Sequence, residues 1–93
     1  MARPAVSDDV FRAIADRTRR RIVELLAQRP HSPSELAAEY DSCQSTISEH
    51  LGVLRRGVGL ARFEDTAGRR TYYANLSALD EVADCVDALQ EQR

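Results

Sequence analysis

Hydrophobic residues recur every three or four positions through most of this chain, and this period predicts a largely helical fold. The first apolar stripe falls at about residues 8–15 and consists of Val10, Phe11 and Ile14. Asp16 has the position of an N-cap for a second helix, which is expected to end near residues 29–30. The apolar face of this second helix is formed by Ile22, Val23, Leu25 and Leu26. The pattern thus predicts two amphipathic helices at the beginning of the chain.

A third helix is predicted from Ser32 onward by the signature of a capping box, because Glu35 follows three residues later and Pro33 suits the first helical position. After a short connection at residues 41–42, a fourth helix is expected from about residue 43. Its buried face is predicted to hold Ile47, Leu51 and Leu54, and its exposed face Ser45, Glu49 and Arg56. Two helices joined so closely predict a helix-turn-helix motif over about residues 32–57, with a polar face available for DNA.

Gly57 and Gly59 end the fourth helix, and two strands are predicted after them, at about residues 60–65 and 69–75. A hairpin at this place is typical of a wing. Ser77 is expected to cap a last helix over about residues 77–91, with an apolar stripe of Leu79, Val82, Ala83, Val86 and Leu89. The predicted fold class is α+β, mostly α: a winged helix-turn-helix with five helices and a two-stranded β-hairpin wing over about residues 60–75.

The length of 93 residues predicts a single domain with one core over residues 1–93. Hydrophobic residues make up 43% of the chain, which indicates a folded protein rather than a disordered one. No apolar run approaches a membrane span, and residues 1–4 lack the apolar stretch of a signal peptide. We therefore expect a cytoplasmic protein without membrane contact, in which both cysteines are reduced.

The formal net charge of −2 hides an uneven distribution of charge along the chain. Residues 76–93 contain one arginine and five acidic residues: Asp80, Glu81, Asp84, Asp87 and Glu91. All other arginines lie in residues 1–75, where basic residues outnumber acidic ones. Because phosphates respond to the local field, this distribution is compatible with DNA binding by the earlier part of the chain.

The apolar stripes of the first and last helices have no obvious cover within so short a chain. Exposed stripes of this kind are typical of interfaces between subunits, and the simplest partner is a second copy related by a two-fold axis. We therefore predict a homodimer through the helices at about residues 8–15 and 77–91, with an interface formed by Val10, Phe11, Ile14, Leu79, Val82, Val86 and Leu89. The alternative is that the two helices pack on each other within one monomer.

Four segments together resemble the ArsR/SmtB family of winged-helix repressors: VFRAIADRTRRRIVELL at 10–26, SELAAE at 34–39, QSTISEHL at 44–51 and RRTYYANL at 69–76. The resemblance implies a dimer formed through the first and last helices. It also implies repression of transcription by binding to a palindromic operator, with release when a ligand, metal ion or oxidant arrives.

By this resemblance, the start of the fourth helix enters the major groove of double-stranded DNA. Glutamine pairs with adenine and serine with several base edges, whereas arginine side chains hold phosphates. The predicted DNA contacts are Gln44, Ser45, Thr46, Ser48, Glu49, Arg55, Arg69 and Arg70. Simple solvation is the alternative explanation for the polar face of this helix.

The chain departs from the family pattern at Arg17, at Ser42, at Glu49 and in the segment 57–59. Glu49 places a carboxylate where the family often has a basic or neutral polar residue. The segment 57–59 makes the approach to the wing one residue longer. Glu49, the acidic pI of the chain and the altered approach to the wing support an alternative function, a winged-helix module that binds protein and has lost its contact with DNA.

The metal-binding motifs of the family are missing from this sequence. Residues 34–40 contain no cysteine or histidine, and residues 76–93 contain no histidine. Cys43 and His50 are separated by about 10 Å of helical rise, which is too far for one zinc ion. We therefore predict no metal site and no cofactor, and interpret His31 and His50 as a loop residue and a helix-flank residue.

Cys43 lies at or beside the N-cap of the fourth helix, where the positive end of the helix dipole favours the thiolate. Its oxidation would add bulk and negative charge near phosphate, so a redox-sensing repressor is a further hypothesis. The alternative is that Cys43 replaces a capping serine and has no regulatory role. Cys85 is interpreted as a packing residue at the edge of the last stripe. No catalytic spacing of Ser, His and Asp is recognisable, so an enzyme is not expected.

Overall fold

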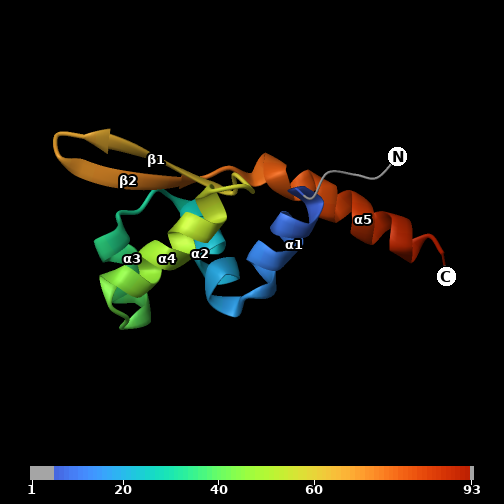
Figure 1. Ribbon diagram of the computed structural model, residues 1–93, viewed down its shortest axis with the longest axis horizontal. Coiled ribbons are helices and arrows are strands. Elements are labelled where there is room, and N and C mark those ends of the chain that lie inside the picture. Colours follow the sequence, from blue (N-terminus) through green and yellow to red (C-terminus); the bar gives the residue numbers. More distant parts are fainter. Residues whose placement is uncertain (1–5, 93) are drawn as a thin grey trace.

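The computed structural model describes residues 6–92, with a group of helices at the centre, a hairpin extending to one side and a last helix extending to the other (Figure 1). Its principal dimensions are 48 × 25 × 20 Å. The elements follow in the order α1 (Val6–Ala15), α2 (Arg17–Gln28), α3 (Pro33–Tyr40), α4 (Gln44–Arg55), β1 (Ala61–Thr66), β2 (Arg69–Ala74), the 3₁₀ helix η1 (Leu76–Leu79) and α5 (Asp80–Gln90). The predicted winged helix-turn-helix, with five α-helices and a two-stranded hairpin in this part of the chain, is confirmed.

Asp16 begins α2 as predicted. Its carboxylate accepts the backbone N–H of Arg19 at 2.9 Å, and this hydrogen bond lowers the pKa of Asp16 because it stabilises the ionised form. The first turn of α2 also caps the end of α1. The Arg19 guanidinium donates to the carbonyl of Ala13 at 2.8 Å, and Arg20 donates to that of Ile14 at 2.7 Å. These carbonyls belong to the last turn of α1, which has no helical partner for them.

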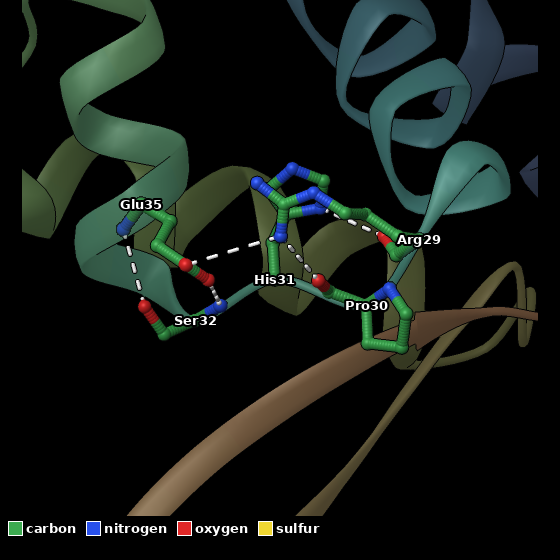
Figure 2. A network of polar contacts seen from close by, with 5 residues as sticks. All are labelled: Arg29, Pro30, His31, Ser32 and Glu35. Carbon is green, nitrogen blue, oxygen red and sulfur yellow. Dashed lines mark hydrogen bonds and ion pairs between the residues drawn. The ribbon is translucent and has the colours of Figure 1, made fainter.

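The capping box predicted at the start of α3 is present (Figure 2). The Ser32 hydroxyl accepts the backbone N–H of Glu35 at 3.2 Å, and Glu35 Oε1 accepts the backbone N–H of Ser32 at 2.8 Å. The second bond lowers the pKa of the Glu35 carboxyl. At the other end of α3, Asp41 has a left-handed backbone with φ of 50°, so the chain turns directly into α4.

The core is filled by apolar side chains from α1 to α4 and from the base of the hairpin. Its most deeply buried members are Val10, Ala13, Ile22, Leu36, Ile47, Leu51, Leu54 and Leu60. The buried face predicted for α4 is therefore confirmed. Val10 is 1% exposed within a single copy of the chain, so its predicted place between two subunits is corrected. The stripe on α1 is wide enough that Val10 points into the core of its own chain while Phe11 remains exposed.

Strands β1 and β2 pair in antiparallel register, with Ala61 opposite Ala74 and Thr66 opposite Arg69. Their bounds agree with the predicted strands to within about one residue. The turn between them places Gly68 at φ of 76°, a left-handed backbone that glycine adopts without strain. The hairpin projects from the helical core beside α3 and α4 (Figure 1).

His31, interpreted from the sequence as a loop residue, is 3% exposed and ties the hairpin to the helices. The backbone N–H of Tyr72 donates to the His31 carbonyl at 2.8 Å, and the His31 N–H donates back at 3.1 Å. The Nδ1 atom of its ring lies 2.8 Å from the carbonyl oxygen of Arg29, next to the capping box (Figure 2). The link between α2 and α3 therefore anchors β2.

Ser77 does not cap the last helix, which corrects that prediction. The chain first forms η1, and α5 then begins after Leu79 without a side-chain cap. The Ser77 hydroxyl donates to Asn75 Oδ1 at 2.9 Å, so it is engaged outside α5. Asn75 in turn donates its side-chain amide to the carbonyl of Gly59 at 2.8 Å. This turn is thereby held against the approach to the hairpin.

Helix α5 contacts η1 and α1 and then extends away from the other helices (Figure 1). Leu79 and Val82 lie partly buried against the core. Further along the helix, Val86 is 44% exposed and Leu89 is 67% exposed. The alternative in which the first and last helices cover each other within one monomer therefore holds only for the beginning of α5.

Candidate nucleic-acid interface

The first turns of α4 present a continuous polar surface. Cys43 is the N-cap, with an extended backbone, and the polar residues that follow it are all exposed: Gln44, Ser45, Thr46, Ser48 and Glu49. Ile47 and Leu51 of the same helix are fully buried, so rotation of α4 would expose apolar core. The structure thus places five of the eight predicted DNA contacts together on the exposed surface of the first turns of α4. We call this set of five the α4 polar face.

Helix α3 orients the first residue of the α4 polar face. The Ser34 hydroxyl donates to the side-chain oxygen of Gln44 at 3.3 Å, which leaves the amide N–H groups of Gln44 outside this contact. A groove separates the starts of α3 and α4 from the wing, and it is lined by Ser32, Pro33, Ser34, Glu35, Gln44, Arg69 and Arg70. Hydrogen-bonding groups from three elements therefore converge at one edge of the molecule.

The two adjacent arginines of the wing have different surroundings. Arg69 is exposed opposite Thr66, and within the described part of the chain it has no ion pair. Arg70 is opposite Asp65 and donates two hydrogen bonds to its carboxylate, at 2.9 and 3.1 Å. These bonds lower the pKa of Asp65 and raise that of Arg70, because each charge stabilises the other. Nothing in the sequence distinguished Arg69 from Arg70, because the pairing of Arg70 with Asp65 depends on the register of the hairpin.

Arg55, the last residue of α4, does not join the α4 polar face. It is partly buried, and its guanidinium carbon lies 5.1 Å from the centre of the Phe63 ring. Its Nε is buried and has no hydrogen-bond partner among residues 6–92. The side chain therefore connects the end of α4 to strand β1, away from the residues at the start of the helix.

The Cys43 thiol lies exposed at the start of α4. Its sulfur is 3.3 Å from Ser45 Oγ and 3.1 Å from Thr46 Oγ1. The hydroxyl of Ser45, and then that of Thr46, lowers the pKa of Cys43 from 9.0 to about 7, because O–H donors stabilise the thiolate. The sequence indicated a lowered thiol pKa from the helix dipole and missed these hydroxyls. The second cysteine, Cys85, was interpreted as a packing residue but is exposed in the single chain.

Arg19 is a residue of this region that the sequence did not indicate. Its guanidinium lies 3.4 Å from His50 Nδ1 on α4, while its Nε bonds to the Ala13 carbonyl of α1. One side chain from α2 therefore touches both neighbouring helices. The only signal in the sequence is the arginine-rich segment at 19–21, which does not reveal which guanidinium turns inward.

Two negative findings apply to residues 6–92. No group of three or more His, Cys, Asp and Glu side chains there is placed to hold a metal ion. No helix in the same range is long and apolar enough to cross a membrane.

The α3–α4 pair, the α4 polar face and the hairpin beside it define a winged helix-turn-helix DNA-binding protein. Residues 14–62 match the model of a family described as helix-turn-helix domain. The chain is 30% identical over 67 residues to the transcriptional repressor SdpR of Bacillus subtilis, which is 72% of each protein. It is 44% identical over 48 residues to the HTH-type transcriptional regulator Rv2034 of Mycobacterium tuberculosis, covering 52% of this chain and 45% of that protein.

Among solved structures, the chain is similar to an ArsR-like transcriptional regulator from Rhodococcus sp. RHA1. The TM-score is 0.85 at 26% sequence identity, and the match covers 95% of this chain and 80% of the other. The chain therefore belongs to the helix-turn-helix family and is a transcriptional regulator of the ArsR type. The predicted resemblance is confirmed, and these relatives are regulators rather than enzymes.

Proposed function

We propose that this chain is a homodimeric repressor that binds a palindromic operator, with α4 of each subunit in the major groove. The observation that carries the proposal is the α4 polar face, exposed next to a wing whose Arg69 has no ion pair within residues 6–92. A rigid apolar face behind it, with Ile47 and Leu51 in the core, supports a fixed presentation of the polar side chains.

Within this proposal, Gln44, Ser45, Thr46 and Ser48 read base edges. Gln44 can donate its amide N–H groups to acceptors such as adenine N7, since Ser34 already occupies one side of its oxygen. Glu49 can accept from the amino group of cytosine, the usual partner of a carboxylate in the major groove. Arg69 at the wing is suited to phosphate, where it sets position rather than sequence. Arg55 acts from behind the interface, through Phe63.

The proposed dimer uses the apolar surface that a single chain leaves exposed. Phe11, Val86 and Leu89 are exposed large hydrophobic residues. An apolar groove between α1, α2 and η1 is lined by Ile14, Arg20, Val23, Glu24, Ala27, Leu76 and Leu79. A two-fold axis through this surface would place two α4 helices in equivalent half-sites, which is why a palindromic operator is expected.

We further infer that the repressor works in the cytoplasm and has no catalytic role. It is also inferred to work without a metal sensor of the family's kinds, because residues 34–40 lack cysteine and histidine and residues 76–93 lack histidine. A protein-binding module without DNA contact remains the competing function that the experiment below must separate.

The test is selection of bound duplexes from a random DNA pool by the purified protein in reducing buffer. We expect a palindromic consensus whose binding weakens steeply with salt, because phosphate contacts release counterions. Gln44→Ala should relax the consensus at one position of each half-site, whereas Gln90→Ala, at the end of α5, should change nothing. A wild-type protein that enriches no sequence and binds no duplex at low salt would sink the proposal and favour the protein-binding module.

A second candidate, control of the same repressor by thiol oxidation, is favoured by the exposed Cys43 thiol with its pKa of about 7. With hydrogen peroxide, the thiolate sulfur attacks one peroxide oxygen, an S–O bond forms, the O–O bond breaks and hydroxide leaves. The resulting sulfenic acid adds bulk beside Ser45 and Thr46. Peroxide should release DNA from the wild type and not from Cys43→Ser. An equal response of both proteins would exclude this candidate.

A further inference from the structure

We propose that Asp65 and Phe63 restrain Arg70 within the wing, so that Arg69 makes the wing's phosphate contact and Arg70 positions the wing against α4. The inference rests on the proposed function, since it assigns roles within the DNA interface. It differs from the prediction made from the sequence, in which both arginines contact DNA.

The first observation is the pairing across the hairpin. Asp65 and Arg70 are directly opposite in the register, and the guanidinium donates to both carboxylate oxygens, at 2.9 and 3.1 Å. An isolated surface ion pair is weak because two long side chains must be ordered. Here the strand backbone already holds the partners opposite each other, and a two-pronged arginine–carboxylate contact has the favoured geometry.

The second observation is a pair of contacting aromatic rings, of which Phe63 lies beneath the Arg70 guanidinium. The Arg70 guanidinium carbon lies 3.8 Å from the centre of the Phe63 ring. Phe63 is partly buried and contacts the buried Tyr72 with ring centres 5.4 Å apart. A guanidinium over an aromatic face is held both electrostatically and by contact area. Arg70 is therefore attached to the core through two aromatic residues.

The third observation connects this arrangement to α4. Arg55, at the end of α4, lies 5.1 Å from the same Phe63 ring. Phe63 is thus shared by a guanidinium from the helix and one from the wing. Movement of Arg70 toward DNA would break its contacts with both Asp65 and Phe63, and would loosen the link between the two parts of the interface.

Arg69 has none of these restraints. It is opposite Thr66, so no carboxylate faces it across the hairpin. Arg69 lines the same groove as Gln44 of the α4 polar face and Glu35 of α3. A free guanidinium at the tip of the wing is the group that a phosphate can recruit without breaking an existing ion pair.

The test measures how duplex affinity depends on salt, with a fluorescein-labelled duplex selected by the wild-type protein. Each phosphate contact contributes about 0.9 to the slope of log affinity against log salt. Arg69→Gln should flatten the slope by about 0.9 per subunit. The charge-neutral exchange Asp65→Asn with Arg70→Gln should leave the slope unchanged. It should also lower the affinity at every salt concentration by up to roughly tenfold, the combined scale of one cross-strand ion pair and one cation–π contact.

Asp65→Asn alone should free Arg70 and steepen the slope by about 0.9 per subunit. The matched control is Glu64→Gln, which removes the same charge from the neighbouring position, where Glu64 pairs with Arg62 at 3.1 Å. Glu64→Gln should raise the affinity for the duplex only slightly, because the loss of one negative charge makes the local electrostatic field more favourable to phosphate. Thermal unfolding of each variant checks that the fold is retained.

A double exchange that flattens the slope as much as Arg69→Gln would overturn the inference and leave the proposed function intact. A wild type whose binding to every duplex is independent of salt would remove the proposed function and this inference together. A second readout needs no DNA: the Arg70 Cδ protons should be shifted upfield by the Phe63 ring in the NMR spectrum of the wild type. Arg70 Cδ protons that resonate at ordinary chemical shifts would also contradict the proposed restraint of Arg70 by Phe63.

Discussion

The reactivity of Cys43 is predicted to depend on two neighbouring hydroxyls. Replacing Ser45 with Ala and Thr46 with Val removes the groups that lie 3.3 and 3.1 Å from the Cys43 sulfur. The pKa of the thiol should then return from about 7 toward 9.0. Because the thiolate is the nucleophile, the pH at which the thiol becomes reactive should rise with its pKa.

The magnitude follows from two opposing effects. At pH 7, a pKa of about 7 leaves half of the thiol ionised, and a pKa of 9.0 leaves about one hundredth, a loss of roughly fiftyfold in thiolate. A more basic thiolate is intrinsically more nucleophilic, by roughly eightfold over this range for a Brønsted coefficient of about 0.45. The rate at pH 7 should therefore fall by only about sixfold, whereas the midpoint of the pH profile should move from about 7 to about 9. The midpoint of the pH profile therefore tests the prediction more clearly than the rate at pH 7.

The assay is stopped-flow reaction with an aromatic disulfide reagent across a range of pH. It is run in a Cys85→Ser background so that Cys43 is the one thiol that reacts. Ser48→Ala is the matched control, because it removes a hydroxyl from the exposed face of α4 without any contact to the sulfur. A parent profile with a midpoint near 9, or a midpoint unmoved by loss of both hydroxyls, would refute the reasoning. The lowered pKa also means that ionisation of Cys43 stabilises the fold above about pH 9, a contribution lost as the pH falls through about 7.

Three further predictions concern stability and assembly. Leu51→Ala should lower the free energy of unfolding in urea by about 2–5 kcal/mol, since this side chain is fully buried. Ser48→Ala, at an exposed position, should change that free energy by less than about 0.5 kcal/mol. Similar losses from both substitutions would contradict the assigned burial of the two side chains. Asp16 has a lowered pKa in the folded chain, so its ionised carboxylate contributes to stability above its ordinary pKa of 3.8, and this contribution is lost as the pH falls through the pKa of the folded state. Asp16→Asn should remove this part of the loss of thermal stability in acid. A dependence of thermal stability on pH that is the same in both proteins would argue against the Asp16 cap. Leu89→Glu should turn the proposed dimer into a folded monomer in light scattering, an expectation that fails if the wild type is itself monomeric.

The local elements of this fold were predictable because each depends on residues close together in the chain. Asp16 and Ser32 cap their helices through backbone groups three residues away, and the sequence showed both. The same holds for much of the α4 polar face, because helical period alone separates Ser45 and Glu49 from the buried Leu51. Ser77 was misassigned since a nearby side chain, Asn75, competes for its hydroxyl.

What the amino-acid sequence determined by itself was therefore the order and faces of the helices, the position of the wing and the residues at the start of α4. The tertiary structure alone decided which side chains meet across elements. It paired Arg70 with Asp65 and left Arg69 free, and it buried His31 against β2. The physical reason is range: caps and helical faces follow from spacing within a few residues, whereas strand register and side-chain stacking are set by how separate elements pack together.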